Sequence, residues 1–120
     1  MTASTTRIDI LFRSRVKEGG ESLFQEYLEK VYQLTEAEES HVLGYEIFVQ
    51  EDGTYLQHER YEDEEAIYKH LAVTAEGQAA WAEATELLEI DFIGDLSRES
   101  WERWRTPTAT RYTRFRSIAR

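Results

Sequence analysis

The fold of this chain is decided by the stretch Gly44-Tyr45-Glu46-Ile47-Phe48-Val49-Gln50-Glu51-Asp52-Gly53-Thr54-Tyr55 and its continuation to His70. Apolar and polar residues alternate on both sides of Glu51-Asp52-Gly53, which is typical of two strands joined by a tight turn. From Asp63 onward, the apolar residues recur at helical spacing instead. The stretch therefore predicts a β-hairpin that leads into a helix.

The length of the turn determines which face of the hairpin is apolar, because one residue of slip turns every side chain over. A two-residue loop at Asp52-Gly53 pairs Tyr45 with Arg60 and places charge on the apolar face. A three-residue loop, with Gly53 in the left-handed region, pairs Tyr45 with Glu59. We predict the second register, because it keeps the tyrosines of the third strand among the other apolar side chains.

The remaining elements follow from the same periodicities. Strands are expected at 7–16, 42–50, 54–62 and 88–96, a first helix at 21–35, and a loop or frayed helix end at 36–40. A second helical region begins at Asp63, where acidic residues favour a helix start, and turns Ala66, Ile67, His70 and Leu71 inward. Its second segment is expected to be capped by Thr74. The order βαββαβ with right-handed crossovers predicts an α+β, ferredoxin-like sandwich, in which both helices cover one face of a four-stranded antiparallel sheet.

The sheet face without helices is expected to be an interface. It carries about one apolar residue per strand, ringed by charged side chains; the apolar residues are Leu11, Phe48, Leu56 and Ile93. An apolar centre with a charged rim is more typical of a protein interface than of a wetted sheet. We therefore predict a homodimer through the open sheet face.

Composition excludes several classes of function. The 120 residues carry a net charge of −10 and no cysteine, so disulfides and thiolate chemistry are excluded. The acidic body argues against nucleic acid, which requires a concentrated positive face. There is no apolar run long enough for a membrane span, and no secretory signal pattern is visible before Arg7. We expect a cytoplasmic protein that binds neither nucleic acid nor membrane.

The chain divides into an acidic domain, residues 1–97, and a basic extension, residues 98–120. The extension carries seven arginines against Glu99 and Glu102. It is expected to form a short helix with Trp101 and Trp104 on one face, then an extended segment after Pro107. Because domains of this class stop near the fourth strand, we expect the extension to pack on the domain, to cover its pocket or to lie on a dimer partner.

Two ionisable side chains, Glu59 and His70, point toward an interior that is otherwise apolar and aromatic. Buried polar groups cost free energy unless they have partners, so the pair is either an internal hydrogen bond or a functional site. Both interpretations stay open at this stage. The histidines His41, His58 and His70 lie on three different elements without ligand spacing, so we expect no metal.

The motifs resemble one known family. Gly44-Tyr45 opening a strand, and Glu59-Arg60-Tyr61-Glu62-Asp63 leading into Ala66-Ile67-Tyr68-Lys69-His70-Leu71, resemble the antibiotic biosynthesis monooxygenase (ABM) domain over roughly residues 7–96. The resemblance implies a dimeric α/β barrel, built from two such sheets. Some family members oxygenate quinols or anthrones without a cofactor, whereas others degrade haem or have other roles.

The resemblance implies a monooxygenase without a cofactor that acts on a small aromatic, quinol-like substrate. A base in a dry pocket would take a proton from the substrate, and the resulting anion would reduce O₂ directly. His70 is the expected base and Glu59 its orienting partner. The expected walls of the substrate pocket are Tyr45, Tyr61 and Trp81.

Two alternatives remain. The first is a non-catalytic, dimeric ligand-binding or stress-related domain, in which Glu59 and His70 are only structural. The second and weaker one is haem binding or degradation. The haem-degrading branch relies on Asn, Trp and a helical His, but this sequence contains no Asn, and Trp81 aligns with the haem-ligating His.

Overall fold

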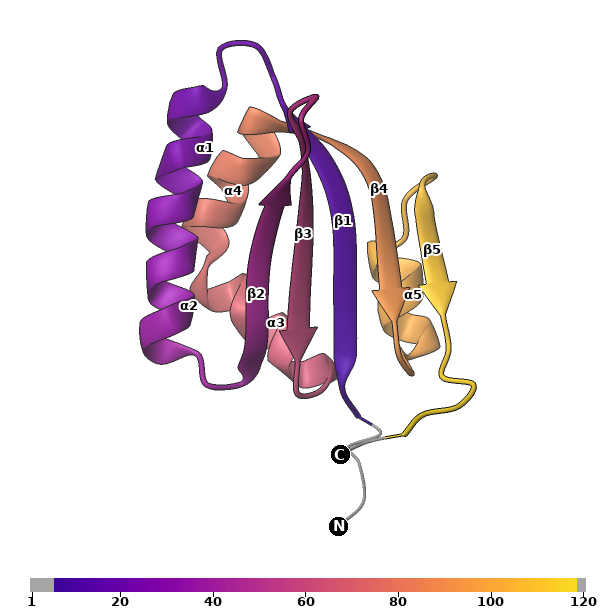
Figure 1. Ribbon diagram of the computed structural model, residues 1–120. Helices are drawn as coiled ribbons and strands as arrows, with labels where there is room; N and C mark the ends of the chain where they lie inside the picture. The colour runs from indigo at the N-terminus through magenta and orange to yellow at the C-terminus, as the bar shows by residue number, and fades with distance from the viewer. Residues whose placement is uncertain (1–5, 119–120) are drawn as a thin grey trace.

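A sheet with the strand order β2-β3-β1-β4-β5 forms the frame of the computed structural model, which describes residues 6–118 (Figure 1). The strands are β1 (Ile8–Val16), β2 (Val42–Val49), β3 (Thr54–Tyr61), β4 (Thr85–Ile93) and β5 (Ala109–Tyr112). The helices are α1 (Glu21–Tyr27), α2 (Gln33–Glu38), α3 (Glu64–Val73), α4 (Ala75–Ala84) and α5 (Arg98–Trp104), and a π-helical turn (Leu28–Tyr32) joins α1 to α2. Residues 1–5 of the expected domain and residues 119–120 of the expected extension lie outside the described residues.

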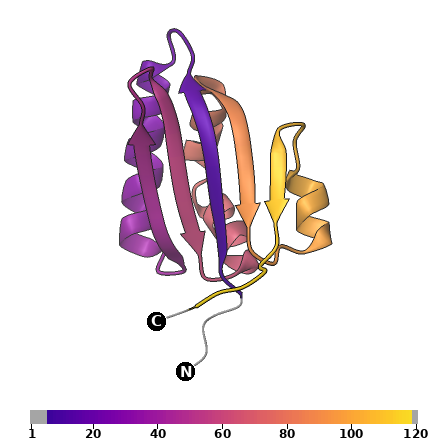
Figure 2. The same cartoon turned by 45° about the vertical axis from the view of Figure 1, so that its right-hand side comes forward.

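The helices α1 to α4 lie on one face of the sheet, and Figure 2 shows the opposite face without a covering helix in the described part of the chain. This arrangement confirms the α+β, ferredoxin-like prediction. The expectation of four strands was wrong in one detail, because β5 pairs in parallel with β4 and makes the sheet mixed. Between residues 6 and 118, no helix combines the length and hydropathy that a membrane crossing requires.

The hairpin has the predicted three-residue turn. Tyr45 pairs with Glu59 and Ile47 pairs with Gln57 across β2 and β3. Gly53 has a φ of 87°, in the left-handed region that glycine tolerates best. The turn is closed by Asp52, whose side chain accepts a hydrogen bond of 2.9 Å from the backbone N–H of Thr54. This register turns the side chains of Gln57, Glu59 and Tyr61 toward the helices, where all three are buried.

The first helical region is longer than expected. It continues through the π-helical turn to Glu38, so of the two alternatives for residues 36–40 the helix end agrees with the structure and a loop from residue 36 does not. Thr35 explains the extension, because it is buried against the core and its hydroxyl donates a 2.8 Å hydrogen bond to Glu39. As a result Glu39 lies inside the protein, with only 3% of its surface exposed.

The fourth strand begins and ends three residues earlier than expected, at Thr85 and Ile93 rather than 88 and 96. Thr85 is β-branched and already extended, so the chain leaves the helical conformation directly after Ala84. Gly94 then ends the strand with a φ of 128°. Leu96 is buried as expected, but it lies in the irregular segment between β4 and α5.

Two smaller expectations about α3 and α4 also need correction. Leu71 was expected on the inner stripe of α3, but 38% of its surface is exposed. Thr74 precedes α4, yet its hydroxyl donates to the backbone carbonyl of His70 instead of capping the new helix. Asp63 does cap α3, by accepting a 2.8 Å hydrogen bond from the N–H of Ala66.

The residues after β4 pack against the domain. The indole rings of Trp101 and Trp104 lie 6.0 and 6.2 Å from the ring of Phe92, measured between centroids. The carboxylate of Glu64 on α3 accepts hydrogen bonds from Ser97 and from the buried hydroxyl of Ser100. The helix α5 is therefore held to both β4 and α3.

Helix α4 packs very closely against the first helical region at Gly77. A Cβ atom added at Gly77 would lie 2.2 Å from Cγ2 of Val31, which is fully buried. Val31 is β-branched and has little rotational freedom within a helix. Glycine at position 77 is therefore required by the close approach of the two helices.

We expect Gly77→Ala to lower the free energy of unfolding by about 1–3 kcal/mol, the usual cost of overpacking a core. The loss should appear although alanine is the better helix former by about 1 kcal/mol. Chemical denaturation measures the change. The double variant Val31→Ala, Gly77→Ala serves as control, because it provides room for the new methyl group. If the loss of stability in the double variant equals the sum of the losses in Val31→Ala and Gly77→Ala, the steric explanation fails.

Candidate functional site

A cavity of about 250 Å³ lies between the sheet and the helices α3 and α4. Apolar and aromatic side chains make most of its wall, among them Ile10, Phe12, Tyr61, Ile67, Trp81 and Phe92. Two residues of the C-terminal segment, Trp104 and Thr106, close one side. The only carboxylate among the described lining residues is Glu59, and Gln78 contributes an amide. The cavity therefore combines a mainly apolar wall with very few polar groups, as small-molecule sites do.

Glu59 enters the cavity from β3. Its carboxylate accepts a hydrogen bond from the Tyr61 hydroxyl and another, of 3.2 Å, from the amide of Gln57. Burial raises the pKa of Glu59 above its ordinary value, because the charged form loses its hydration. The charge of His70 and hydrogen bonding from Tyr61, Tyr45 and Gln57 oppose this rise in pKa. Glu59 is therefore a buried carboxyl group that favours the protonated form more than an exposed one does.

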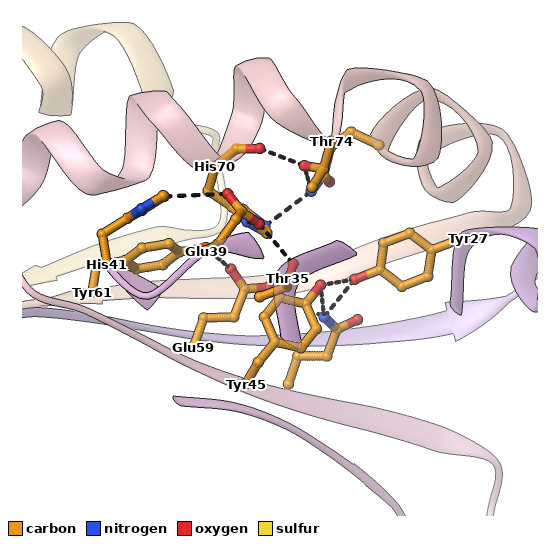
Figure 3. A network of polar contacts seen from close by, with 11 residues as sticks. Tyr27, Thr35, Glu39, His41, Tyr45, Glu59, Tyr61, His70 and Thr74 are labelled. Carbon is orange, nitrogen blue, oxygen red and sulfur yellow. Dashed lines mark hydrogen bonds and ion pairs between the residues drawn. The ribbon is translucent and has the colours of Figure 1, made fainter. Parts of the chain in front are cut away.

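His70 lies behind the cavity rather than in its wall. Its ring is fully buried between α3 and the sheet, with Nδ1 at 2.9 Å from the carboxylate of Glu39 (Figure 3). Nε2 lies 3.4 Å from the amide nitrogen of Gln78, which does line the cavity. If Nδ1 carries the proton that is donated to Glu39, then Nε2 accepts from Gln78, and this tautomer satisfies both contacts.

The carboxylate that orients His70 is thus Glu39, not Glu59 as the sequence suggested. Glu59 and His70 do not share the direct hydrogen bond that was expected, and His70 favours the ionised form of Glu59 only when its own ring is protonated. Glu39 is held in place by the hydroxyl of Thr35 and by Nε2 of His41 at 3.2 Å. The two predicted residues therefore lie in one polar network but have different immediate partners.

Tyr45 belongs to this network, on the side away from the cavity. Its hydroxyl contacts the hydroxyl of Tyr27 and lies 3.3 Å from the amide of Gln57. Its ring packs against His70, with 5.7 Å between centroids (Figure 3). Burial raises the pKa of Tyr45 well above its usual range, so this hydroxyl keeps its proton. Tyr45 lines a separate surface hollow of about 250 Å³, together with Thr35 and Glu39.

Trp81 and Tyr61 both lie in the cavity wall. The indole of Trp81 meets the ring of Phe12 edge-on, with 5.4 Å between centroids. Its Nε1 is buried and makes no hydrogen bond within residues 6–118. An N–H donor in this state is available to an acceptor atom of a bound molecule.

The structure therefore brings Glu59, Tyr61 and Trp81 together at the cavity, and places His70 and Tyr45 behind it. Three polar residues around the candidate site were missed from the sequence: Glu39, Gln57 and Gln78. The alternation of β3 was a usable signal for Gln57, because it lies two residues before Glu59 and so shares its face. Glu39 gave no such signal, since it ends an acidic run that resembles a solvated surface.

From residue 6 to residue 118, no three His, Asp or Glu side chains are grouped as ligands of one metal ion. His58 lies on the open sheet face, where its Nε2 is 2.8 Å from the carboxylate of Asp9.

The raised pKa of Glu59 has a consequence for stability. A carboxyl group with a higher pKa in the folded state stabilises the fold below its unfolded pKa, and this contribution is lost as the pH rises through the folded value. Glu59→Gln removes the ionisation. We therefore expect the free energy of unfolding of the variant, relative to wild type, to increase as the pH rises above the unfolded pKa of Glu59 and to level off above its folded pKa. Chemical denaturation at several pH values measures this difference in the free energy of unfolding. The control is Glu83→Gln, which changes an exposed carboxylate. A difference independent of pH would show that burial does not raise this pKa.

Solved structures of other proteins share the fold of this chain. MupZ from Pseudomonas fluorescens is 16% identical, with a TM-score of 0.75 over 100% of this chain and 94% of its own. A conserved protein from Methanosarcina mazei Go1 is 18% identical, with a TM-score of 0.60 over 74% of this chain and 92% of its own. Rv0793 from Mycobacterium tuberculosis is 17% identical, with a TM-score of 0.63 over 78% of this chain and 98% of its own. At such identities the likeness shows the fold alone.

No curated protein sequence matches the chain significantly. The sequence model of one family, Antibiotic biosynthesis monooxygenase, matches residues 8–86, which run from the start of β1 into β4. This match covers well over half of the chain and includes the hairpin, Glu59, His70 and Trp81. The chain therefore belongs to the antibiotic biosynthesis monooxygenase family.

Proposed function

We propose that this protein is a monooxygenase that works without a cofactor on a small aromatic, quinol-like substrate. The observation that carries the proposal is the position of Glu59, a buried carboxyl group in a cavity with otherwise apolar and aromatic walls. A base with a raised pKa is better matched to proton abstraction near neutral pH than an ordinary carboxylate is. Membership of the family supports the same reaction class.

The reaction starts with removal of a proton from the substrate. Glu59 takes the proton from an acidic C–H or O–H bond, for example the CH₂ group of an anthrone. The carbanion gives one electron to O₂, and the carbon radical and superoxide combine to a peroxide, which receives a proton. Loss of water then leaves a carbonyl group. One oxygen atom ends in the product, and the other leaves as water with the two hydrogen atoms of the CH₂ group.

The other residues of the site have supporting roles in this proposal. Tyr61 and Gln57 hold the carboxylate of Glu59, and Trp81 with Phe12 gives flat walls for an aromatic ring. The cavity volume, about 250 Å³, is near the lower end of ligand sites, which are roughly 300–1,000 Å³, and suits a small molecule. The cavity favours Glu59 over His70 as the base, because His70 reaches it only through Gln78.

We also propose that the protein forms a homodimer through the open sheet face. The register places Leu11, Leu56 and Ile93 on this face, and half of the surface of Phe48 is exposed there. Charged residues surround them, including Asp9, which is 3.0 Å from Arg7 and 2.8 Å from His58. Domains of this family commonly dimerise. The sheet face is the surface of this chain best suited to that role.

Oxygen uptake tests the proposed reaction. With a panel of hydroquinones and anthrones and metal-free protein, we expect uptake that saturates with substrate. Glu59→Gln should lower kcat by about a hundredfold or more, because general-base catalysis contributes factors of that size. The control Glu83→Gln removes an exposed carboxylate on α4 and should keep the wild-type kcat.

Oxygen uptake equal to the buffer blank for every substrate would reject the proposed monooxygenase activity. Quenching of tryptophan fluorescence by the same compounds would then support the alternative of a ligand-binding domain, in which the polar network is structural. A Soret shift on titration with haem would support the haem alternative instead.

The dimer is tested with one substitution in the centre of the open face. Leu56→Arg places a charge where the proposed interface is apolar, and should shift the protein from dimer to monomer in sedimentation experiments at micromolar concentration. The exposed residue Val73, on the helix side, gives the control Val73→Arg. A wild-type protein that sediments only as monomer would contradict the proposal.

A further inference from the structure

Helix α4 contributes an amide side chain, Gln78, to the wall of the cavity. We propose that Glu39 and His70 orient this amide so that its carbonyl oxygen, Oε1, accepts a hydrogen bond from a phenolic hydroxyl group of the substrate. Gln78 then selects substrates that carry a free hydroxyl group besides the group that reacts at Glu59. This inference rests on the proposed function, because it concerns the same cavity and the same aromatic substrate.

The nitrogen end of the amide is held by groups behind the cavity wall. Nε2 of Gln78 lies 3.4 Å from Nε2 of His70 and 3.2 Å from Oγ1 of Thr74. Neither His70 nor Thr74 is among the described residues that line the cavity. The hydroxyl of Thr74 already donates its proton to the backbone carbonyl of His70, at 2.6 Å, so its oxygen is left to accept (Figure 3). The atom of Gln78 next to Thr74 is therefore the nitrogen, which donates.

The second N–H bond of Gln78 requires an acceptor at His70, and Glu39 provides the reason for one. Oε2 of Glu39 lies 2.9 Å from Nδ1 of His70 and also accepts a hydrogen bond from the hydroxyl of Thr35. An ionised carboxylate only accepts, so Nδ1 of His70 carries the proton and, in the neutral ring, Nε2 keeps a lone pair. A turned amide would place Oε1 of Gln78 against two acceptors. Glu39 and His70 therefore fix the orientation that Thr74 also requires.

The oxygen end of the amide is available to a bound molecule. Oε1 of Gln78 accepts no hydrogen bond within residues 6–118, and it remains accessible. Because Gln78 lines the cavity while its nitrogen is bound behind the wall, Oε1 is the polar atom that this side chain offers inside. A carbonyl oxygen can only accept a hydrogen bond, so its complement in a ligand is a donor.

The position of this acceptor defines the class of substrate. Glu59 enters the cavity from β3 and Gln78 enters from α4, so the two polar groups come from the sheet and from the helix layer that covers it. Phe12 and Trp81 give the same cavity an aromatic wall. A flat aromatic molecule whose reacting group meets Glu59 can therefore present a phenolic hydroxyl to Gln78. An ether or an unsubstituted ring at this point would leave the carbonyl oxygen desolvated without a partner, which lowers affinity.

Binding in the absence of oxygen tests this inference without turnover. Isothermal titration calorimetry compares three compounds with two fused rings: 1-naphthol, 1-methoxynaphthalene and naphthalene. The ether is larger than the phenol and the hydrocarbon is smaller, so size alone cannot favour the phenol over both. We expect wild type to bind 1-naphthol at least about fivefold more tightly than either of the others, as one added hydrogen bond allows. Equal affinities in wild type, or no binding of 1-naphthol, would overturn the inference.

A pair of substitutions separates Gln78 from Glu59 as the acceptor. Gln78→Met keeps the length of the side chain and removes the amide, so it should abolish the preference for 1-naphthol. Gln25→Met, at an exposed position on α1, is the matched control and should keep the preference. A preference that persists in Gln78→Met would place the hydroxyl at Glu59 and reject the role of Gln78.

The orientation itself is read from the ring of wild-type His70 by ¹⁵N NMR, and so does not depend on how well Gln78→Met folds. The chemical shifts of the two ring nitrogens distinguish the tautomers, and we expect Nδ1 to carry the proton at a pH at which the ring is neutral. Glu39→Gln should let the other tautomer appear and weaken the preference for 1-naphthol, because the new amide can donate as well as accept. A proton on Nε2 alone in wild type, or an unchanged preference in Glu39→Gln, would contradict the role of Glu39 and His70.

Oxygen uptake by wild type is measured separately, so the inference and the proposed reaction can fail independently. Uptake without a preference for 1-naphthol would contradict only the inference. A preference for 1-naphthol without uptake would contradict only the monooxygenase, and Gln78 would then select the ligands of a binding domain.

Discussion

The rest of the structure depends on keeping the ionisable groups Glu39, Glu59 and His70 together in one protein interior. Each would cost several kcal/mol if buried without partners. Some partners are local: Thr35 holds Glu39 from the preceding turn, and Gln57 and Tyr61 hold Glu59 from the same strand. The contact between Glu39 and His70 joins distant elements, so its cost is offset only when the end of the first helical region meets α3. The buried polar groups of this protein therefore have all their hydrogen-bond partners only in the correct fold.

The hairpin register serves both faces of the sheet at once. On the inner face it places Glu59 opposite Tyr45, and on the outer face it places His58 opposite Glu46. A slip of one residue would reverse the two sets, with Arg60 moved inside and Glu59 moved outside. Gly53 is the residue that makes the three-residue turn possible, because it alone has a positive φ there. A local backbone preference thus decides where the charges of the whole sheet lie.

The sequence was sufficient for the parts of the fold that depend on periodicity and turn chemistry. The strand alternation and the three-residue turn Glu51-Asp52-Gly53 gave the hairpin register, and hence the inward direction of Glu59. The sequence was insufficient where contacts between distant elements decide the outcome. Nothing local in the acidic run before Ser40 shows that Glu39 is buried, because its burial depends on Thr35 and His70. The pairing of β5 with β4 was missed for the same reason.

Two parts of the chain build the wall of the cavity: the region that the family model matches, and the C-terminal segment beyond it. The matched family region ends at residue 86, and it contains Glu59, His70 and Gln78. Trp104 and Thr106, which close one side of the same cavity, lie beyond it. Of the three structures compared, MupZ alone covers the full chain, including α5 and β5. The size and shape of the cavity can therefore change through the appended segment, while Glu59, His70 and Gln78 stay within the region that the family shares.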